Sequence, residues 1–200
     1  MDIRGIVDSL KGCPCGREHK VDIKAVEIGS GLLGKTADIL SKNGFPNHIL
    51  VVADKNELKA SEGILEVLEK GGFDYGLELY EDLRVADIVD VNKVAELAVS
   101  YDGILSVGSG SCNDICRMAA LKADKRFAIF ATAPSMDGFA SGTSPITENN
   151  FKTTRPARQP EIIIADTKIL AASPNELKAA GFGDIIAKYI ALIDWKVPSL

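Results

Sequence analysis

The feature that most constrains this chain is a regular alternation of strand-like and helix-like segments. Short apolar runs rich in branched residues, typical of strands buried in a parallel sheet, alternate with longer segments whose apolar residues recur at helical spacing. The predicted strands are 23–29, 48–54, 73–80, 103–110 and 127–133. The predicted helices between them are 32–44, 56–72, 91–101 and 111–123. This order predicts an α/β domain with a doubly wound, Rossmann-like parallel sheet.

The pattern changes after the fifth strand. Residues 135–166 are rich in turn-forming residues, with short strands expected at 143–147, 151–154 and 161–165. Ser173, Pro174 and Glu176 then have the layout of a helix start: a cap, a first-position proline and a reciprocal carboxylate. We therefore expect a nucleotide-binding α/β domain over 1–172. Residues 173–200 would begin an all-α metal and substrate domain, incomplete here and represented by its first two helices.

Composition excludes several classes of protein. The chain of 200 residues can hold one large domain, or one domain and part of another. Lysine and arginine total 23 against 28 acidic residues, a net charge of −5, which gives no basic footprint for nucleic acid. No apolar run reaches the roughly 18 residues of a membrane span, and the N-terminus lacks the apolar core of a signal peptide. The 4 cysteines do not suggest a disulfide framework, so a reduced, cytoplasmic protein is the simplest reading.

A glycine-rich turn in GILSVGSGSCND is the first candidate for binding chemistry. Gly108 and Gly110 stand where a strand gives way to a helix. A backbone without a Cβ atom can approach a ligand closely, and the amides of a helix N-terminus favour an anion such as a pyrophosphate. The motif is not G-x-G-x-x-G, so an ordinary tight β–α turn remains the alternative.

Other polar residues follow strands in the same way. Asp54 ends the second strand, where a carboxylate could accept hydrogen bonds from an adenosine ribose and repel a 2′-phosphate, or could simply cap the next helix. Thr132, Ser135 and Asp137 follow the fifth strand, at the edge where open α/β sheets bind ligands. An ordinary Asp-Gly turn is the alternative for that stretch.

A possible metal clip lies near the N-terminus. Cys13, Cys15 and His19 offer three soft ligands within seven residues. No fourth ligand is evident nearby and the segment is close to a chain end, so a segment without a structural zinc is the preferred interpretation.

Three stretches together resemble a known family. GSGSCNDI, TAPSMDGFASG and GFGDIIAKYIALIDW, at their spacings, are similar to the sn-glycerol-1-phosphate dehydrogenases. These belong to the iron-dependent alcohol dehydrogenase and dehydroquinate synthase-like superfamily. The resemblance runs from about Ile23 to Trp195 and is closer to the bacterial branch, some members of which begin with CxCG-x₂-H.

The resemblance implies an enzyme of phospholipid metabolism. It would reduce dihydroxyacetone phosphate to sn-glycerol 1-phosphate with NAD or NADP as the hydride donor. A divalent metal, zinc or nickel or iron, would act as a Lewis acid on the substrate carbonyl. The implied partner is this small phosphorylated molecule, and a homo-oligomer of the chain is left open.

The resemblance also implies roles for particular residues. The pyrophosphate loop would comprise Gly110, Ser111, Cys112, Asn113 and Asp114. Further cofactor contacts would come from Thr132, Ala133, Pro134, Ser135 and Ser141, and Asp54 would bind the ribose. Asp137 would bind substrate, and Asp184 would be the first ligand of the catalytic metal and would touch substrate as well. From the residues alone, Asp184 could equally be a helix N-cap after Gly183.

The chain departs from the family in one respect. The family's metal site also uses two histidines from later helices, and a third histidine binds substrate. This chain has only His19 and His48, both upstream of Asp184. We therefore expect a truncated second domain, and little activity from the 200-residue polypeptide itself.

Two other functions stay open from the sequence. One is a related polyol dehydrogenase, such as a glycerol dehydrogenase, and the other is a non-catalytic nucleotide-binding module. A phosphate-binding cation would favour the phosphorylated substrate over the polyol, and Lys152, Arg155 and Arg158 are the candidates.

Overall fold

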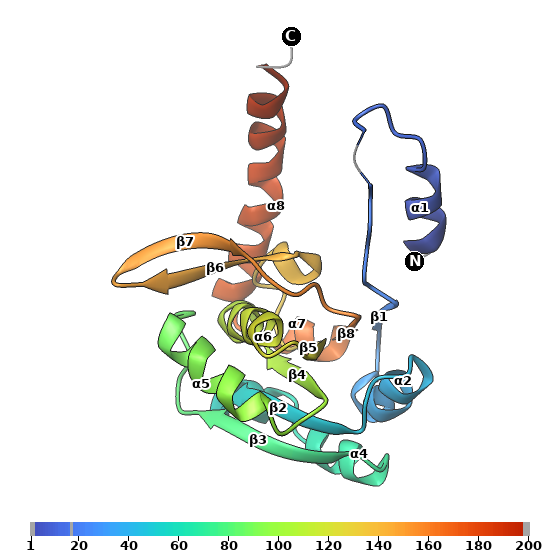
Figure 1. The fold of residues 1–200 in the computed structure, drawn as a ribbon. Coiled ribbons are helices and arrows are strands. Elements are labelled where there is room, and N and C mark those ends of the chain that lie inside the picture. The colour runs from blue at the N-terminus through green and yellow to red at the C-terminus, as the bar shows by residue number, and fades with distance from the viewer. Residues whose placement is uncertain (1–2, 17, 198–200) are drawn as a thin grey trace.

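The computed structural model describes residues 3–16 and 18–197, which build a six-stranded parallel sheet with helices on both faces (Figure 1). The strand order is β1-β8-β5-β4-β2-β3, and every neighbouring pair is parallel. The strands are β1 (Ala25–Gly29), β2 (His48–Asp54), β3 (Asp74–Tyr80), β4 (Gly103–Gly108), β5 (Arg126–Ala131) and β8 (Ile162–Asp166). This confirms the Rossmann-like α/β class.

The helices divide between the two faces of the sheet. They are α1 (Ile3–Ser9), α2 (Thr36–Lys42), α3 (Lys55–Ala60), α4 (Ile64–Lys70), α5 (Ile88–Ala98), α6 (Gly110–Lys122), α7 (Thr167–Ala172) and α8 (Asn175–Lys196), with 3₁₀ turns η1 (Leu33–Lys35) and η2 (Gly138–Ala140). Buried residues of α2 and α4 pack on one face, and those of α5 and α6 pack on the other. The chain thus changes faces after β3, so β2 and β4 lie side by side at a topological switch point, where such sheets bind ligands.

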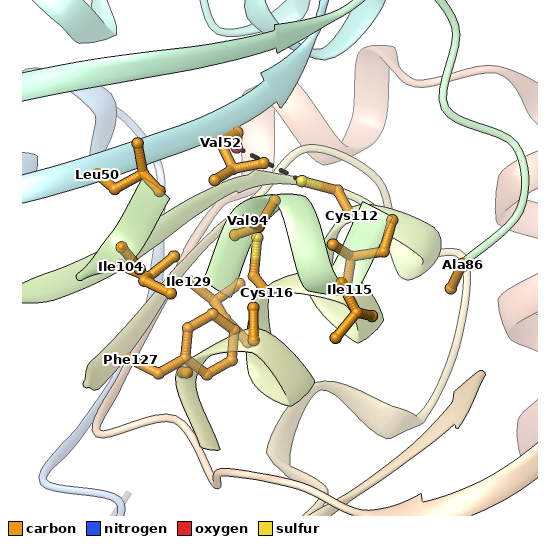
Figure 2. Close-up of a cluster of buried hydrophobic side chains, with 14 of the residues drawn as sticks. Leu50, Val52, Ala86, Val94, Ile104, Cys112, Ile115, Cys116, Phe127 and Ile129 are labelled. Carbon is orange, nitrogen blue, oxygen red and sulfur yellow. Dashed lines mark hydrogen bonds between the residues drawn. The ribbon is translucent and has the colours of Figure 1, made fainter. Parts of the chain in front are cut away.

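The core explains the unbroken apolar strands. Figure 2 shows Cys112 and Cys116 of α6 packed among side chains of β2, β4 and β5, including Val52 and Phe127. On β2, Leu50 and Val52 join this cluster, while the alternate residues Ile49, Val51 and Ala53 join the cluster on the opposite face. A strand covered on both sides has no polar face, as expected for a parallel sheet.

An antiparallel hairpin interrupts the parallel pattern. β6 (Thr143–Glu148) pairs with β7 (Phe151–Pro156), and Ile146 is fully buried in the core beneath it. These strands and β8 match the three short strands expected in the turn-rich segment. The hairpin extends over α6, next to the start of α8 (Figure 1).

Two predicted helices differ from the structure. The segment 56–72 forms α3 and α4 rather than one helix, because Gly63 takes a positive φ of 92° between them. Conversely, α8 is one continuous helix where two were expected. Ser173 does not cap α8: its hydroxyl donates to the carbonyl of Leu170, at 2.8 Å.

The two ends of the described chain carry helices outside the sheet. α1 was not predicted, and α8 projects away from the sheet over most of its length (Figure 1). Within the described residues, none of the helices combines the length and the hydropathy that crossing a membrane requires. The domain boundary near Ser173 remains a prediction.

Candidate cofactor site at the β4–α6 turn

The turn between β4 and α6 leaves a helix N-terminus without a side-chain cap. Ser109 occupies the cap position, but its hydroxyl donates to Oε1 of Glu57 at 2.8 Å, and so does its backbone N–H at 2.6 Å. No described side chain caps the first turn of α6. An uncapped helix N-terminus presents amide N–H groups and a partial positive charge to an anion.

Gly108 is required by the packing of this turn. A Cβ atom there would lie 2.6 Å from Cβ of Cys112 and 2.6 Å from Oε2 of Glu57. Gly110 could carry a Cβ atom without a clash, because the nearest non-neighbouring atom, Sδ of Met136, would lie 3.5 Å away in ordinary van der Waals contact. The first glycine serves the fold, and the second leaves room beside the helix N-terminus.

Glu57 organises the turn from the neighbouring strand end and was missed by the sequence reasoning. It forms a capping box with Asp54, in which the Glu57 N–H donates to Asp54 Oδ1 at 2.7 Å and the Asp54 N–H donates to Glu57 Oε2 at 3.3 Å. Burial raises the pKa of Glu57. The spacing D-x-x-E before a helix was the signal that could have found it.

The structure therefore shows Asp54 as a helix cap. Its other oxygen, Oδ2, accepts from the N–H of Leu83 at 3.3 Å, and the residue is only 5% exposed. A ribose would have to share oxygens that already accept backbone N–H groups. The ribose role of Asp54 remains a prediction.

A cleft of about 690 Å³ lies beside the N-terminus of α6. Its walls come from α6, the 135–138 loop, the β6–β7 hairpin and α8. The predicted site residues that line it are Gly110, Ser111, Asp114, Ser135, Asp137, Ser141 and Asp184. Residues distant in sequence, from 110 to 184, thus meet at one site.

The remaining predicted residues lie around this cleft. Thr132 and Ala133 line a smaller cavity of about 220 Å³ that also reaches Ser109 and Glu57. Pro134 lines a third, apolar cavity. The side chains of Cys112 and Asn113 are fully buried, and Asn113 Nδ2 holds the turn by donating to the Ser109 carbonyl at 2.7 Å. Cys112 can therefore reach a ligand only through its backbone.

α8 brings Asp184 to the 135–138 loop through a close backbone approach. A Cβ atom on Gly181 would lie 1.9 Å from the carbonyl oxygen of Pro134, so only glycine permits this contact. One turn later, Asp184 Oδ2 accepts from the N–H of Asp137 at 3.4 Å. Asp184 lies inside α8 rather than at its start, so the N-cap interpretation is wrong.

Lys188 pairs with one of these two carboxylates, that of Asp137, and was also missed. Its Nζ lies 2.6 Å from Oδ2 of Asp137, and this contact raises the pKa of the lysine. Lys188 lies four residues after Asp184 on the exposed surface of α8, a spacing at which an acid and a base on a helix interact. The cleft therefore holds a mixed-charge rim.

A buried arginine fixes the opposite rim. Arg117 is 1% exposed and donates through Nη1 to the carbonyls of Ser141 and Thr143, at 3.0 and 3.1 Å, and through Nη2 to that of Phe139, at 3.3 Å. These bonds tie the loop before the hairpin to α6. Asp114 lies one turn before Arg117, with Oδ1 3.9 Å from Nε of the arginine.

The three candidate cations of the hairpin region differ in their partners. Arg155 pairs with Glu148, and Arg158 donates to Asp124 at 2.5 Å. Lys152 lines the cleft, and among the described residues no ion pair or hydrogen bond engages its amine. Lys152 is therefore the candidate placed to meet a phosphate in the cleft.

The described residues do not complete a metal site around Asp184. Asp184 is exposed, and the carboxylate of Asp137 already pairs with Lys188. In the described part of the chain, the group of three or more clustered donors that could hold a metal is Cys13, Cys15 and His19, which is not in this cleft. His48 instead contacts Asp74 and the Ser100 carbonyl.

Comparison with known proteins identifies the family. Residues 27–174 match the family model described as iron-containing alcohol dehydrogenase. The chain belongs to the iron-containing alcohol dehydrogenase family. The matched residues include two of the three motifs on which the resemblance rests, GSGSCNDI and TAPSMDGFASG.

Relatives narrow the likeness within the iron-containing alcohol dehydrogenases. The chain is 31% identical over 92% of its length to the glycerol-1-phosphate dehydrogenase (NAD(P)+) of Halalkalibacterium halodurans and covers 48% of that protein. It is 33% identical over 90% of its length to the enzyme of the same name from Bacillus subtilis, again covering 48%. The chain thus spans about half the length of the curated relatives it matches.

A solved structure supports the fold. Glycerol dehydrogenase from Schizosaccharomyces pombe superposes with a TM-score of 0.74 at 19% identity, over 84% of this chain and 43% of that one. At this identity the likeness concerns the fold, and it agrees with the parallel sheet described above.

Proposed function

We propose that this chain provides the cofactor-binding part of an NAD(P)-dependent oxidoreductase that reduces dihydroxyacetone phosphate to sn-glycerol 1-phosphate. The observation that carries the proposal is the uncapped N-terminus of α6, which follows β4 at the switch point of the sheet and lines the cleft. Membership of the iron-containing alcohol dehydrogenases and the names of the relatives support the reaction.

The pyrophosphate of the cofactor would lie against the first turn of α6. The backbone N–H groups of Gly110, Ser111 and Cys112 would donate to its oxygens, and the helix dipole would favour its charge. When bound, the nicotinamide would supply the hydride chemistry. The chain's own part is to position the cofactor and to hold charges at the rim.

The first test is NAD(H) binding by isothermal titration calorimetry. We expect Gly110→Val to weaken binding by about tenfold or more, because a branched side chain would fill the space beside the helix N-terminus. Gly34→Val is the matched control, since an added Cβ there meets nothing within 4 Å and Gly34 does not line the cleft. Equal affinities of wild type and Gly110→Val would remove this assignment.

The choice between NAD and NADP is part of the proposal. A carboxylate at the end of β2 disfavours a 2′-phosphate by charge repulsion, which supports a preference for NAD. Asp54 stands at this strand end, where its side chain caps α3.

A phosphorylated substrate is favoured over an unphosphorylated polyol by the position of Lys152. Lys152 lines the same cleft as Lys188 and the first turn of α6. Asp114 is a carboxyl group near Lys152 within the chain, and a substrate phosphate would add a second anionic partner that a polyol such as glycerol lacks. The glycerol dehydrogenase function is therefore the second candidate, supported by the fold likeness alone.

The phosphate contact can be measured directly. We expect Lys152→Gln to weaken binding of sn-glycerol 1-phosphate in the presence of NADH by about tenfold, the loss of one charge-assisted hydrogen bond. Arg155→Gln is the control, because Arg155 pairs with Glu148 and does not line the cleft. If calorimetry gives the same affinity for glycerol and for glycerol 1-phosphate, the proposal of a phosphorylated substrate is wrong.

We further propose that Asp184 supplies one ligand to a divalent metal. Its place beside Asp137 at the cleft supports this role, but one carboxylate makes a weak site for a transition metal. The described residues that line the cleft do not supply the other ligands, so a complete metal site would need ligands from elsewhere. If no such ligands join it, the third candidate, a non-catalytic nucleotide-binding module, describes the chain.

We also propose a cytosolic location. Its support is that all 4 cysteines are thiols, two of them in the core.

A further inference from the structure

The three soft donors near the N-terminus are brought together by the backbone. The Sγ atoms of Cys13 and Cys15 and a ring nitrogen of His19 all lie within 4.8 Å of one another, and Cys15 Sγ is 3.2 Å from Nε2 of His19. Two left-handed glycines, Gly12 at φ 80° and Gly16 at φ 68°, bracket the two cysteines. Only glycine takes such angles at low cost, so the fold of this loop is specified by its sequence.

Tight turns complete the arrangement. The N–H of Cys13 donates to the Leu10 carbonyl at 3.2 Å, and the N–H of Gly16 donates to the Cys13 carbonyl at 3.3 Å. Both cysteines are thiols rather than partners in a disulfide. The loop therefore presents two sulfurs and an imidazole to one point.

The donor set matches a particular class of metal. Tetrahedral zinc takes thiolate at about 2.3 Å and imidazole at about 2.0–2.1 Å, which places its ligand atoms about 3.3–3.8 Å apart. The observed separations, from 3.2 Å to at most 4.8 Å, reach those values by small side-chain movements. Magnesium and calcium prefer oxygen ligands and do not fit.

We propose that Cys13, Cys15 and His19 bind one thiophilic divalent metal, with Zn²⁺ as the ion that matches best. Water or another external ligand fills the fourth position, as in zinc sites with three protein ligands. The site is exposed at Cys15 and half-buried at the other two residues, so metal reaches it from solvent. It is separate from the cleft and does not depend on the proposed dehydrogenase function.

Metal binding here has a structural consequence for α1. The loop joins α1 to the segment that leads into β1, and the metal closes it. Ile3 and Ile6 of α1 line an apolar cavity of about 430 Å³ together with Met136 of the 135–138 loop and its neighbours Pro134 and Phe139. We expect a metal-closed loop to restrain the chain between α1 and β1, and so to limit the movement of α1 beside this cavity.

Cysteine alkylation of the intact chain tests the site without any substitution. Wild-type protein is freed of metal with a chelator and treated with iodoacetamide, with or without one equivalent of Zn²⁺, and each cysteine is followed by mass spectrometry. We expect zinc to slow alkylation of Cys13 and Cys15 by about tenfold or more, because a metal-bound thiolate is a poor nucleophile. Cys112 and Cys116, both 0% exposed, are internal controls, and Mg²⁺ should protect nothing.

Variants identify the third ligand and separate this site from Asp184. Loss of an outer-shell partner weakens metal binding 10- to 100-fold, so His19→Gln, which removes a direct ligand, should raise the zinc concentration that protects Cys15 by about 100-fold or more. In Lys20→Gln, which keeps all three donors, zinc should protect the two cysteines from alkylation as it does in wild type. The same result is expected for Asp184→Ala. Unchanged alkylation of Cys13 and Cys15 with zinc, or wild-type protection in His19→Gln, would overturn the proposal.

Discussion

Asp114 shows how a single carboxyl group in the cleft responds to burial. It is 8% exposed and lies near Arg117 and Lys152, yet burial outweighs both cations and raises its pKa to about 6. Burial also lowers the pKa of Arg117. For both groups, the hydration free energy lost on burial therefore exceeds the attraction between the two charges, which is common for buried ion pairs.

This raised pKa makes stability depend on pH in a defined window. The folded protein binds the Asp114 proton more tightly than the unfolded chain, so the free energy of unfolding should fall as pH rises from about 4 to about 6. A shift from 3.8 to about 6 corresponds to at most about 3 kcal/mol. We expect Asp114→Asn to remove this fall and to be more stable than wild type at pH well above that window.

Urea unfolding at several pH values measures the effect. Asp38→Asn, at an exposed position on α2, is the control and should follow the wild-type profile. A variant at Asp114 that keeps the wild-type pH profile would show that another group causes it.

The sequence could identify where polar residues gather but not what they contact. Asp54, Asp137 and Gly110 were found because they follow recognisable strands, and strand ends of a parallel sheet share one edge. Their partners come from distant elements: Glu57 reaches Ser109 across 52 residues, and Lys188 reaches Asp137 from α8. No local pattern encodes these contacts, so the residue roles had to come from resemblance.

At the scale of elements, α8 illustrates how a local rule can fail. Two glycines within three residues are unfavourable inside a helix, yet Gly181 and Gly183 both lie inside one helix of 22 residues. Among the described residues of α8, Gly181 alone is buried, Leu177 and Lys178 are half-buried, and the others are exposed. Gly181 is buried because it packs on the Pro134 carbonyl. The contact with Pro134 therefore explains why a glycine stands at position 181 inside the helix, although helix propensity disfavours it there.

The two glycines should respond oppositely to alanine. Gly181→Ala would place a Cβ 1.9 Å from the Pro134 oxygen, so α8 must shift and the protein should lose stability by about 1–3 kcal/mol despite better helix propensity. Gly183→Ala meets nothing within 4 Å and should gain about 0.5–1 kcal/mol.

The comparison of these two variants needs only urea unfolding at one pH. Because they lie two residues apart in the same helix, propensity affects both alike and cancels in the difference. Equal stability of the two variants would show that the close approach of α8 to the 134–136 loop does not exist in solution.

At the scale of the whole molecule, the fold class was predictable and the arrangement was not. Alternating strands and helices specify a parallel sheet because the inner strands are apolar on both faces, as β2 is. The order β1-β8-β5-β4-β2-β3 depends on which faces the helices cover, and that follows from packing between distant segments. The cleft could not be predicted from the sequence for the same reason, because four separate parts of the chain form its walls.

The surface of α8 governs how the molecule behaves at high concentration. Its exposed apolar side chains are Phe182, Ile185, Ile186, Tyr189, Ile190, Leu192, Ile193 and Trp195, with exposed fractions from 48% to 80%. Monomeric proteins rarely leave so many large apolar side chains of one helix in water. We expect the 200-residue chain to self-associate with rising concentration and to be poorly soluble.

Sedimentation velocity over a range of concentrations measures this association. The double variant Ile186→Lys and Ile190→Lys places two charges one helical turn apart on the patch, so it should sediment as a monomer where wild type does not. Val99→Lys, which replaces an apolar residue 68% exposed after α5, adds a lysine elsewhere and should associate as wild type does. NAD affinity should be the same in all three proteins, because none of these positions lines the cleft. A wild-type chain that remains monomeric and soluble at every concentration would show that the apolar face of α8 packs against the chain itself in solution.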